Sequence, residues 1–123
     1  MNTLDLLLKA DINSIKIPKK EIKIKRLSER LNGDVIFTIS ALSLDKLEEL
    51  REANSKDFNI HTILEGVKEP NLKSRELMDK YNAVTPVELV KQLLLPGEIE
   101  DIYLAISKLS GYGINTIEEI KKK

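Results

Sequence analysis

The residues that could carry chemistry in this 123-residue chain are few and widely spaced. His61 is the only histidine, and Asp57 and Glu65 each lie four residues from it, about one helical turn away. A carboxylate at that spacing could orient an imidazole as a general base. However, the chain has no cysteine to act as a nucleophile, and no serine motif surrounds His61. The pattern therefore favours a packing or surface role for this histidine.

The remaining candidate motifs also have simpler structural interpretations. The acidic pairs Glu48-Glu49 and Glu118-Glu119 are adjacent in sequence, so a helix would point the two carboxylates of each pair to different sides. The glycines of Gly111-Tyr112-Gly113 lack the preceding strand of a phosphate loop and are more typical of a helix cap and turn. The sequence holds no zinc or calcium ligand spacing. We therefore expect no catalytic residue, no metal and no cofactor, and predict that the chain is not an enzyme.

Composition excludes further classes of function. Twenty basic and twenty acidic side chains cancel, which argues against binding to nucleic acid. The N-terminal apolar run of residues 4–8 is too short for a membrane span or a signal peptide, so we expect a cytosolic protein that does not contact a membrane. The basic run from Lys16 to Arg26 alternates with apolar residues and fits the solvent face of a strand, although recognition of an acidic partner stays open.

The N-terminal third combines a short helix with a predicted β-hairpin over residues 20–42. Thr3 is placed to cap a helix that carries Leu4, Leu7 and Leu8. Isoleucines at alternate positions then indicate a half-buried strand, and a second strand is rich in β-branched residues. The turn dipeptide Asn32-Gly33 between them favours an antiparallel hairpin. The residues expected on the buried faces are Ile22, Ile24, Val35, Phe37, Ile39 and Ala41.

Residues 43–123 are predicted to form the helical part of the same domain. Five of these helices have a candidate N-terminal cap, and the caps are Ser43, Asp57, Asn71, Thr85 and Thr116. Thr116 and Glu119 have the spacing of a capping box that would open a last helix running into the terminal lysines. The most economical fold is one α+β domain over residues 1–123, mainly helical, in which the hairpin packs with a compact bundle of about five to six short helices.

The stretch from Thr85 to Gly113 has the densest apolar pattern. Thr85 and Glu88 form a capping box ahead of one helix, and Pro96-Gly97 breaks the chain before a second. Gly111 is placed to end this second helix in the left-handed conformation. The residues expected in the core are Leu93, Leu94, Ile102, Ile106 and Leu109.

The phrases LLLPGEI and LSGYG in this stretch resemble the XkdN-like tail assembly chaperones of PBSX-type prophages. LLKAD, PKKEIKIKRL and ILEGVKEPNLKSRELMDKYN resemble the same family in the same order, so the similarity covers nearly the whole chain. The stretch from Leu50 to Phe58 is shorter than in many members. The resemblance implies a non-catalytic assembly factor of a phage or phage-tail-like bacteriocin. Such a factor would bind the tape measure protein in the bacterial cytoplasm, with the tail tube protein as a second candidate partner, and would be absent from the mature particle.

Two other functions fit the same sequence: a structural tail component, or a small helical protein-binding adaptor. For a chaperone we expect a shallow apolar binding surface at two tight turns, although these turns could equally serve only as corners. We also expect a weak homo-oligomer, because a two-stranded hairpin leaves at least one edge open. The residues predicted to bind the partner are Leu95, Pro96, Gly97, Gly111, Tyr112 and Gly113.

Overall fold

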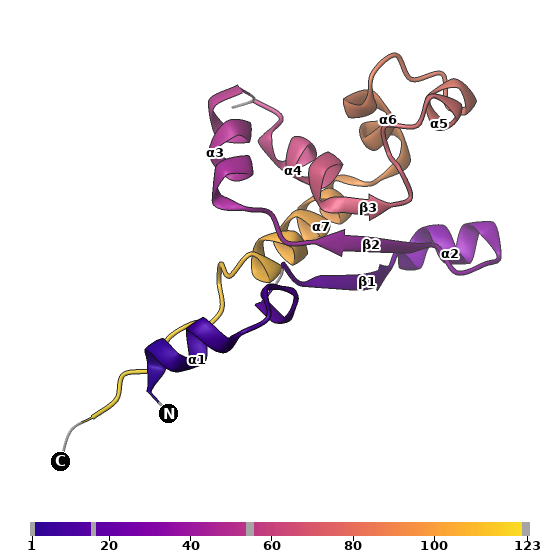
Figure 1. Cartoon of the computed structure of the whole chain (residues 1–123). Coiled ribbons are helices and arrows are strands. Elements are labelled where there is room, and N and C mark those ends of the chain that lie inside the picture. Colours follow the sequence, from indigo (N-terminus) through magenta and orange to yellow (C-terminus); the bar gives the residue numbers. More distant parts are fainter. Residues whose placement is uncertain (1, 16, 54–55, 122–123) are drawn as a thin grey trace.

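The computed structural model describes the chain except for residues 1, 16, 54–55 and 122–123 (Figure 1). It is a mainly helical α+β fold, as predicted. A 3₁₀ turn at Ile12–Ile15 precedes the first strand. The elements are α1 Thr3–Lys9, β1 Lys19–Lys23, α2 Lys25–Leu31, β2 Ile36–Ser40, α3 Leu44–Ala53, α4 Phe58–Gly66, β3 Val67–Glu69, α5 Arg75–Lys80, α6 Pro86–Leu93 and α7 Pro96–Leu109.

The three strands form an antiparallel sheet in the order β1-β2-β3. Ile22 lies opposite Phe37 in the β1–β2 pair, and the predicted inward face of β2 is confirmed by the burial of Phe37 and Ile39. The pairing of β2 with β3 contains a register shift between Thr38 and Ile39. A three-residue strand directly after a helix gives little periodic signal, and for this reason β3 was missed.

The predicted hairpin connection was wrong. β1 and β2 do pair, but helix α2 connects them instead of a tight turn. Ile24 and Leu27 are both buried, and a spacing of three residues between core positions is helical. Asn32 has φ 55° and ends α2 in the left-handed conformation, so the Asn32-Gly33 dipeptide closes a helix.

The core lies between the sheet and helices α4 and α7. Helix α7 runs across one side of the sheet in Figure 1, and α4 packs against it. Of the five residues expected in the core, Leu94, Ile102 and Ile106 are buried, while Leu93 and Leu109 are half-buried against it. The approach of α4 to α7 depends on Gly66, because a Cβ there would lie 2.6 Å from Ile106 Cδ1.

Two of the predicted caps are confirmed. Thr85 Oγ1 accepts a hydrogen bond from Glu88 N at 3.2 Å, and the Glu88 carboxylate accepts one from Val84 N at 2.9 Å. Ser43 Oγ accepts from Lys46 N at the start of α3. Each side chain thus satisfies a donor that the first helical turn leaves unpaired.

Three other predicted caps were wrong in detail. Asn2, rather than Thr3, accepts from the first turn of α1, and Ser74, rather than Asn71, caps α5. Asn71 Oδ1 accepts from Lys73 N two residues on, which is a local turn interaction that competes with capping. Asp57 stands at the cap position of α4 without capping it, and its carboxylate lies 3.5 Å from Lys91 Nζ.

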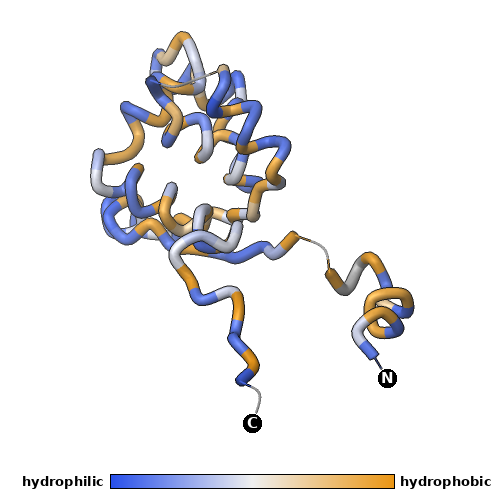
Figure 2. The backbone as a smooth tube through the Cα atoms, turned by 90° about the vertical axis from the view of Figure 1, so that its left-hand side faces the viewer, coloured by the Kyte–Doolittle hydropathy of each residue, from blue (hydrophilic) through white to orange (hydrophobic). Residues whose placement is uncertain are grey.

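Two arms extend from the body, which we define as residues 18–112. The N-terminal arm (residues 2–15 and 17) contains α1, in which no residue is buried. The C-terminal arm (residues 114–121) is exposed and irregular, so the helix predicted from Thr116 does not form in this structure. Its capping box lacks a packing surface, which a short helix needs in water. Both arms extend below the body and are separate from each other in Figure 2.

Candidate protein-binding surfaces

Helix α7 carries the first predicted binding segment at its N-terminal end. Leu94 is buried, and the chain then turns so that the Leu95 side chain is 51% exposed. Pro96 occupies the first turn of α7, where its missing N–H costs nothing. Pro96 and Gly97 are exposed as well. The corner therefore presents an accessible, mostly apolar surface.

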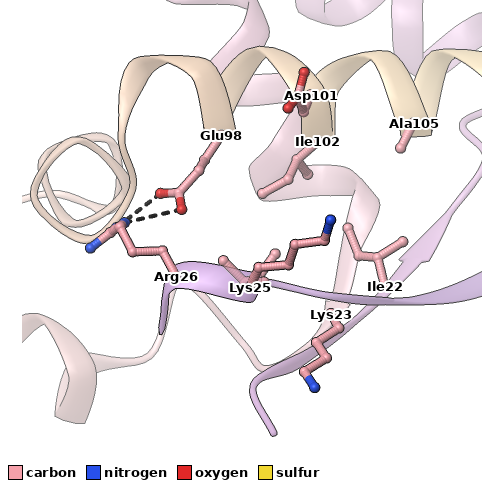
Figure 3. A pocket seen from close by; sticks show the side chains of 9 residues that line it. Ile22, Lys23, Lys25, Arg26, Glu98, Asp101, Ile102 and Ala105 are labelled. Atoms are coloured by element: carbon pink, nitrogen blue, oxygen red, sulfur yellow. Dashed lines mark hydrogen bonds and ion pairs between the residues drawn. The ribbon is translucent and has the colours of Figure 1, made fainter. Parts of the chain in front are cut away.

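An ion pair holds this corner to α2. Arg26 donates from Nε to Glu98 Oε2 at 3.1 Å and from a terminal nitrogen to Glu98 Oε1 at 2.9 Å (Figure 3). The guanidinium also donates to the Leu93 carbonyl, and Glu98 accepts from Leu95 N at 2.7 Å. The hydrogen bond from Arg26 and that from Leu95 lower the pKa of Glu98 below its usual value, although partial burial opposes them. Because this bidentate pair joins both sides of the corner, the backbone of Leu95 is fixed.

The second predicted segment lies at the opposite end of α7. Gly111 has φ +99° and Gly113 φ +70°, conformations that favour glycine. Gly111 N donates to Lys108 O and Tyr112 N donates to Ser107 O, which together form a Schellman motif. The predicted left-handed cap at Gly111 is therefore confirmed.

Tyr112 projects from this turn beside an aromatic pair. Its side chain is 46% exposed and borders a hollow of about 210 Å³ between α3, α4 and α7. Phe58 and Tyr103 meet edge to face in the same hollow, with ring centroids 6.0 Å apart, and the Arg51 guanidinium lies 5.8 Å from the Phe58 ring. The aromatic character of this end of α7 was not foreseen, because Phe58 of α4 lies far in sequence from Tyr103 of α7 and from Tyr112 in the turn after it.

The two predicted segments do not form one continuous site. Helix α7 has 14 residues, so its ends are separated by roughly 21 Å. Leu95, Pro96 and Gly97 lie at one end, and Gly111 to Gly113 lie at the other. Their role in binding a partner stays a prediction, now as two separate contact points.

A groove that the sequence did not reveal runs between β1–α2 and α7 (Figure 3). It encloses about 450 Å³, with Ile22, Ile102 and Ala105 among its lining residues. The Lys25 side chain extends beneath α7 in this view, whereas Lys23 points away from it. The groove forms where the β1–α2 segment meets α7, which is distant from it in sequence, and no local sequence pattern predicts such a contact.

The arms hold the largest set of exposed apolar side chains. The four leucines of α1 are between 59% and 72% exposed, and Ile12, Ile15 and Ile17 of the same arm are exposed too. In a helix Leu6 faces away from Leu4, Leu7 and Leu8, so leucines occupy more than one side of α1. Leucines on more than one side of α1 were the signal in the sequence for a helix that binds another chain, because a helix packed on one core needs only one apolar face.

The polar residues considered above do not assemble into a reactive centre. His61 is half-buried on α4, whereas Asp57 pairs with Lys91, and Glu65 accepts from Lys73 Nζ at 2.8 Å. The hydrogen bond from Lys73 lowers the pKa of Glu65. Among the described residues, no group of three or more histidine, aspartate or glutamate side chains could hold a metal ion. Within the same residues, no helix is long and apolar enough to cross a membrane.

A small α+β body with two exposed aliphatic arms is typical of a protein that binds other protein chains. Comparison with family models makes the assignment specific. The chain belongs to the phage XkdN-like tail assembly chaperone family, whose model matches residues 4–121. The resemblance read from the sequence is thus confirmed, and with it a general role in phage tail assembly.

The fold also matches a solved structure. The crystal structure of a protein named yqbn is similar with a TM-score of 0.67 and 25% sequence identity, over 80% of this chain and 88% of that one. A comparison with curated proteins gave no match.

Proposed function

We propose that this protein is a non-catalytic chaperone that binds the tape measure protein in the host cytoplasm and leaves before the tail is complete. Membership of the tail assembly chaperone family supports the general role. The observation that carries the finer proposal is the set of exposed aliphatic side chains on the arms and at Leu95. Exposed apolar groups of this extent mark a surface that contacts another chain.

The physical requirement on such a chaperone fits the structure. A protein that must later be displaced by polymerising tail tube subunits has to bind through contacts that are individually modest. Several small apolar contacts on many copies give sufficient total affinity and still permit stepwise release. The separated surfaces found here, namely two arms and two ends of α7, meet that requirement better than one deep pocket would.

The test is co-expression with the tape measure protein encoded in the same tail gene cluster. We expect the tape measure protein to remain soluble and to co-purify with the chaperone, and to aggregate when the chaperone is omitted. Leu95→Asp and Tyr112→Ala, each first shown to fold by circular dichroism, test the two ends of α7 separately. Failure of the wild-type protein to bind or solubilise the tape measure protein would refute the proposal.

Mass spectrometry of purified particles separates a chaperone from a structural tail component. We expect the chain to be absent from finished particles and present in assembly intermediates. A stoichiometric presence in the mature tail would show that the protein is structural. Co-expression of the chaperone with the tail tube protein, followed by the same co-purification, determines whether the tail tube protein is a second partner.

A further inference from the structure

The two arms are joined to the body at neighbouring points. Pro18, at the base of the N-terminal arm, accepts a hydrogen bond from Ala41 N at 3.0 Å. Ser110, at the end of α7, accepts one from Leu42 N at 3.1 Å. Two consecutive residues of the β2–α3 connection thus hold the bases of both arms, and the arms diverge from there on the same side of the body (Figures 1 and 2).

Helix α1 is too short to be stable without a partner. Its seven residues fall well below the roughly 12–15 that an isolated helix needs in water. It buries no residue against the body. Contact of its leucine side chains with another surface would therefore stabilise this helix.

The C-terminal arm has the same property in a different form. Ile114, Ile117 and Ile120 recur every three residues and are exposed, and Thr116 and Glu119 provide capping-box chemistry. A helix capped by Thr116 would place Ile117 and Ile120 along one side, with Ile114 two residues ahead of the cap. The segment is irregular in this structure, so a helix there would need a surface on which its isoleucines could pack.

Both arms combine acidic and basic groups with their aliphatic side chains. Asp5 and Lys9 lie on α1, and Glu119 and Lys121 lie on the C-terminal arm. Such mixed charge does not select a strongly charged ligand. The ligand that fits the arms is therefore one that presents a row of aliphatic side chains, as one face of an amphipathic helix does.

We propose that the N-terminal and C-terminal arms together hold an aliphatic-faced helical segment of an unassembled tail protein and fold around it. This inference rests on the proposed function and assigns its main contact to the arms rather than to the ends of α7. The arms leave the body from neighbouring points, at the hydrogen bonds of Ala41 and Leu42, so one client helix lying between them can contact both. Arms that were permanently filled by a second copy of the chain would have no surface left for the client.

The test compares matched triple variants. The arm variant carries Leu4→Ser, Leu7→Ser and Leu8→Ser, and the control carries Leu31→Ser, Leu44→Ser and Val84→Ser, which replace similarly exposed residues of the body. A second control replaces the three arm leucines by methionine, which keeps the side chains apolar. Ile117→Ser with Ile120→Ser tests the C-terminal arm. All variants should melt like wild type, because none of these residues is buried.

Two probes are used: the tape measure protein, and a synthetic amphipathic peptide with one leucine face. We expect each serine arm variant to weaken binding of both probes by at least about tenfold, the effect of losing a single buried aliphatic contact. The body control and the methionine variant should bind within about threefold of wild type, a change of about 0.65 kcal/mol or less. Carbon chemical shifts of residues 116–121 should become helical when the peptide is added.

The outcomes separate this inference from the proposed function. If the tape measure protein binds the serine arm variants as tightly as wild type, the arm assignment is wrong and the chaperone role stands. If the peptide binds through the arms while the tape measure protein never binds, the arms hold a different client and the proposed function fails. If sedimentation shows that wild type self-associates through the arms, and the arm variants become monomeric without losing either probe, the arms hold a second copy and the inference is overturned.

Discussion

Gly66→Ala is the substitution that most directly tests how the core is assembled. Gly66 is the last residue of α4, and a Cβ added there would lie 2.6 Å from Ile106 Cδ1 and 3.0 Å from Ile106 Cγ2. Both distances are far shorter than the roughly 3.5–4.0 Å of an optimal carbon–carbon contact. Ile106 is fully buried, so its side chain cannot move into solvent to relieve the overlap.

Two opposing effects set the size of the change. Alanine is favoured over glycine within a helix by about 0.5–1 kcal/mol. Inserting a methyl group into a filled core costs about 1–3 kcal/mol. The second effect is larger because Ile106 is held between α4 and α7, so we expect a net loss of about 1–2 kcal/mol in the free energy of unfolding.

The assay is urea unfolding followed by circular dichroism, applied to a double-mutant cycle with Ile106→Val. Valine lacks Cδ1, the atom nearest to the added methyl group, and the single change alone should cost about 0.5–1.5 kcal/mol. The double variant should be more stable than the sum of the single effects predicts, by at least about 0.5 kcal/mol. Additive effects, or a Gly66→Ala protein more stable than wild type, would refute the close packing of α4 on α7.

Three further predictions address the core, the corner and the sheet edge. Leu94→Ala and Ile106→Ala should each lower the free energy of unfolding by about 2–5 kcal/mol in urea, and wild-type-like unfolding would show that neither is a core residue. Because the folded-state pKa of Glu98 lies below its unfolded value of 4.5, its contribution to stability is complete above pH 4.5 and is lost as the pH falls through the lower folded value. Thermal unfolding of Glu98→Gln should accordingly show a smaller loss of stability than wild type on acidification in that range, whereas parallel curves would mean that the Arg26–Glu98 pair contributes nothing. The outer edge of β1 has no strand partner in the described sheet, so sedimentation at increasing concentration should show weak reversible association, and a strict monomer at all concentrations would contradict this.

The elements that the sequence predicted well are those whose signals are local. The Thr85–Glu88 cap, the break at Pro96 and the left-handed Gly111 each depend on residues within one turn of the backbone, and all three occur as predicted. The alternating burial of Phe37 and Ile39 is local in the same sense. Strand pairing partners, the short strand β3 and the groove beside Ile22 depend on distant segments, so spacing along the chain could not reveal them.

The hairpin error shows how one strong local signal can support the wrong structure. Asn32 tolerates positive φ, which both a hairpin turn and a helix end require. The deciding residues were Ile24, Leu27 and Ser28, whose burial follows a helical spacing. A β-turn between the two strands would have exposed Leu27, so burial of this one leucine selects the helix.

The two arms show a second limit to what an apolar sequence pattern can predict. Leucines spaced for a helical face in α1, and isoleucines spaced by three after Gly113, satisfy the same criteria as the core residues of α7. A periodic pattern specifies that a face will be buried, but not which chain will bury it. In α7 the covering surface belongs to the same chain, because α4 and the sheet lie against Ile102 and Ile106. For the arms, no described part of the chain covers the apolar side chains. Leaving leucines in contact with water is unfavourable, so an exposed leucine face of this kind is best explained by a second protein that binds and buries it.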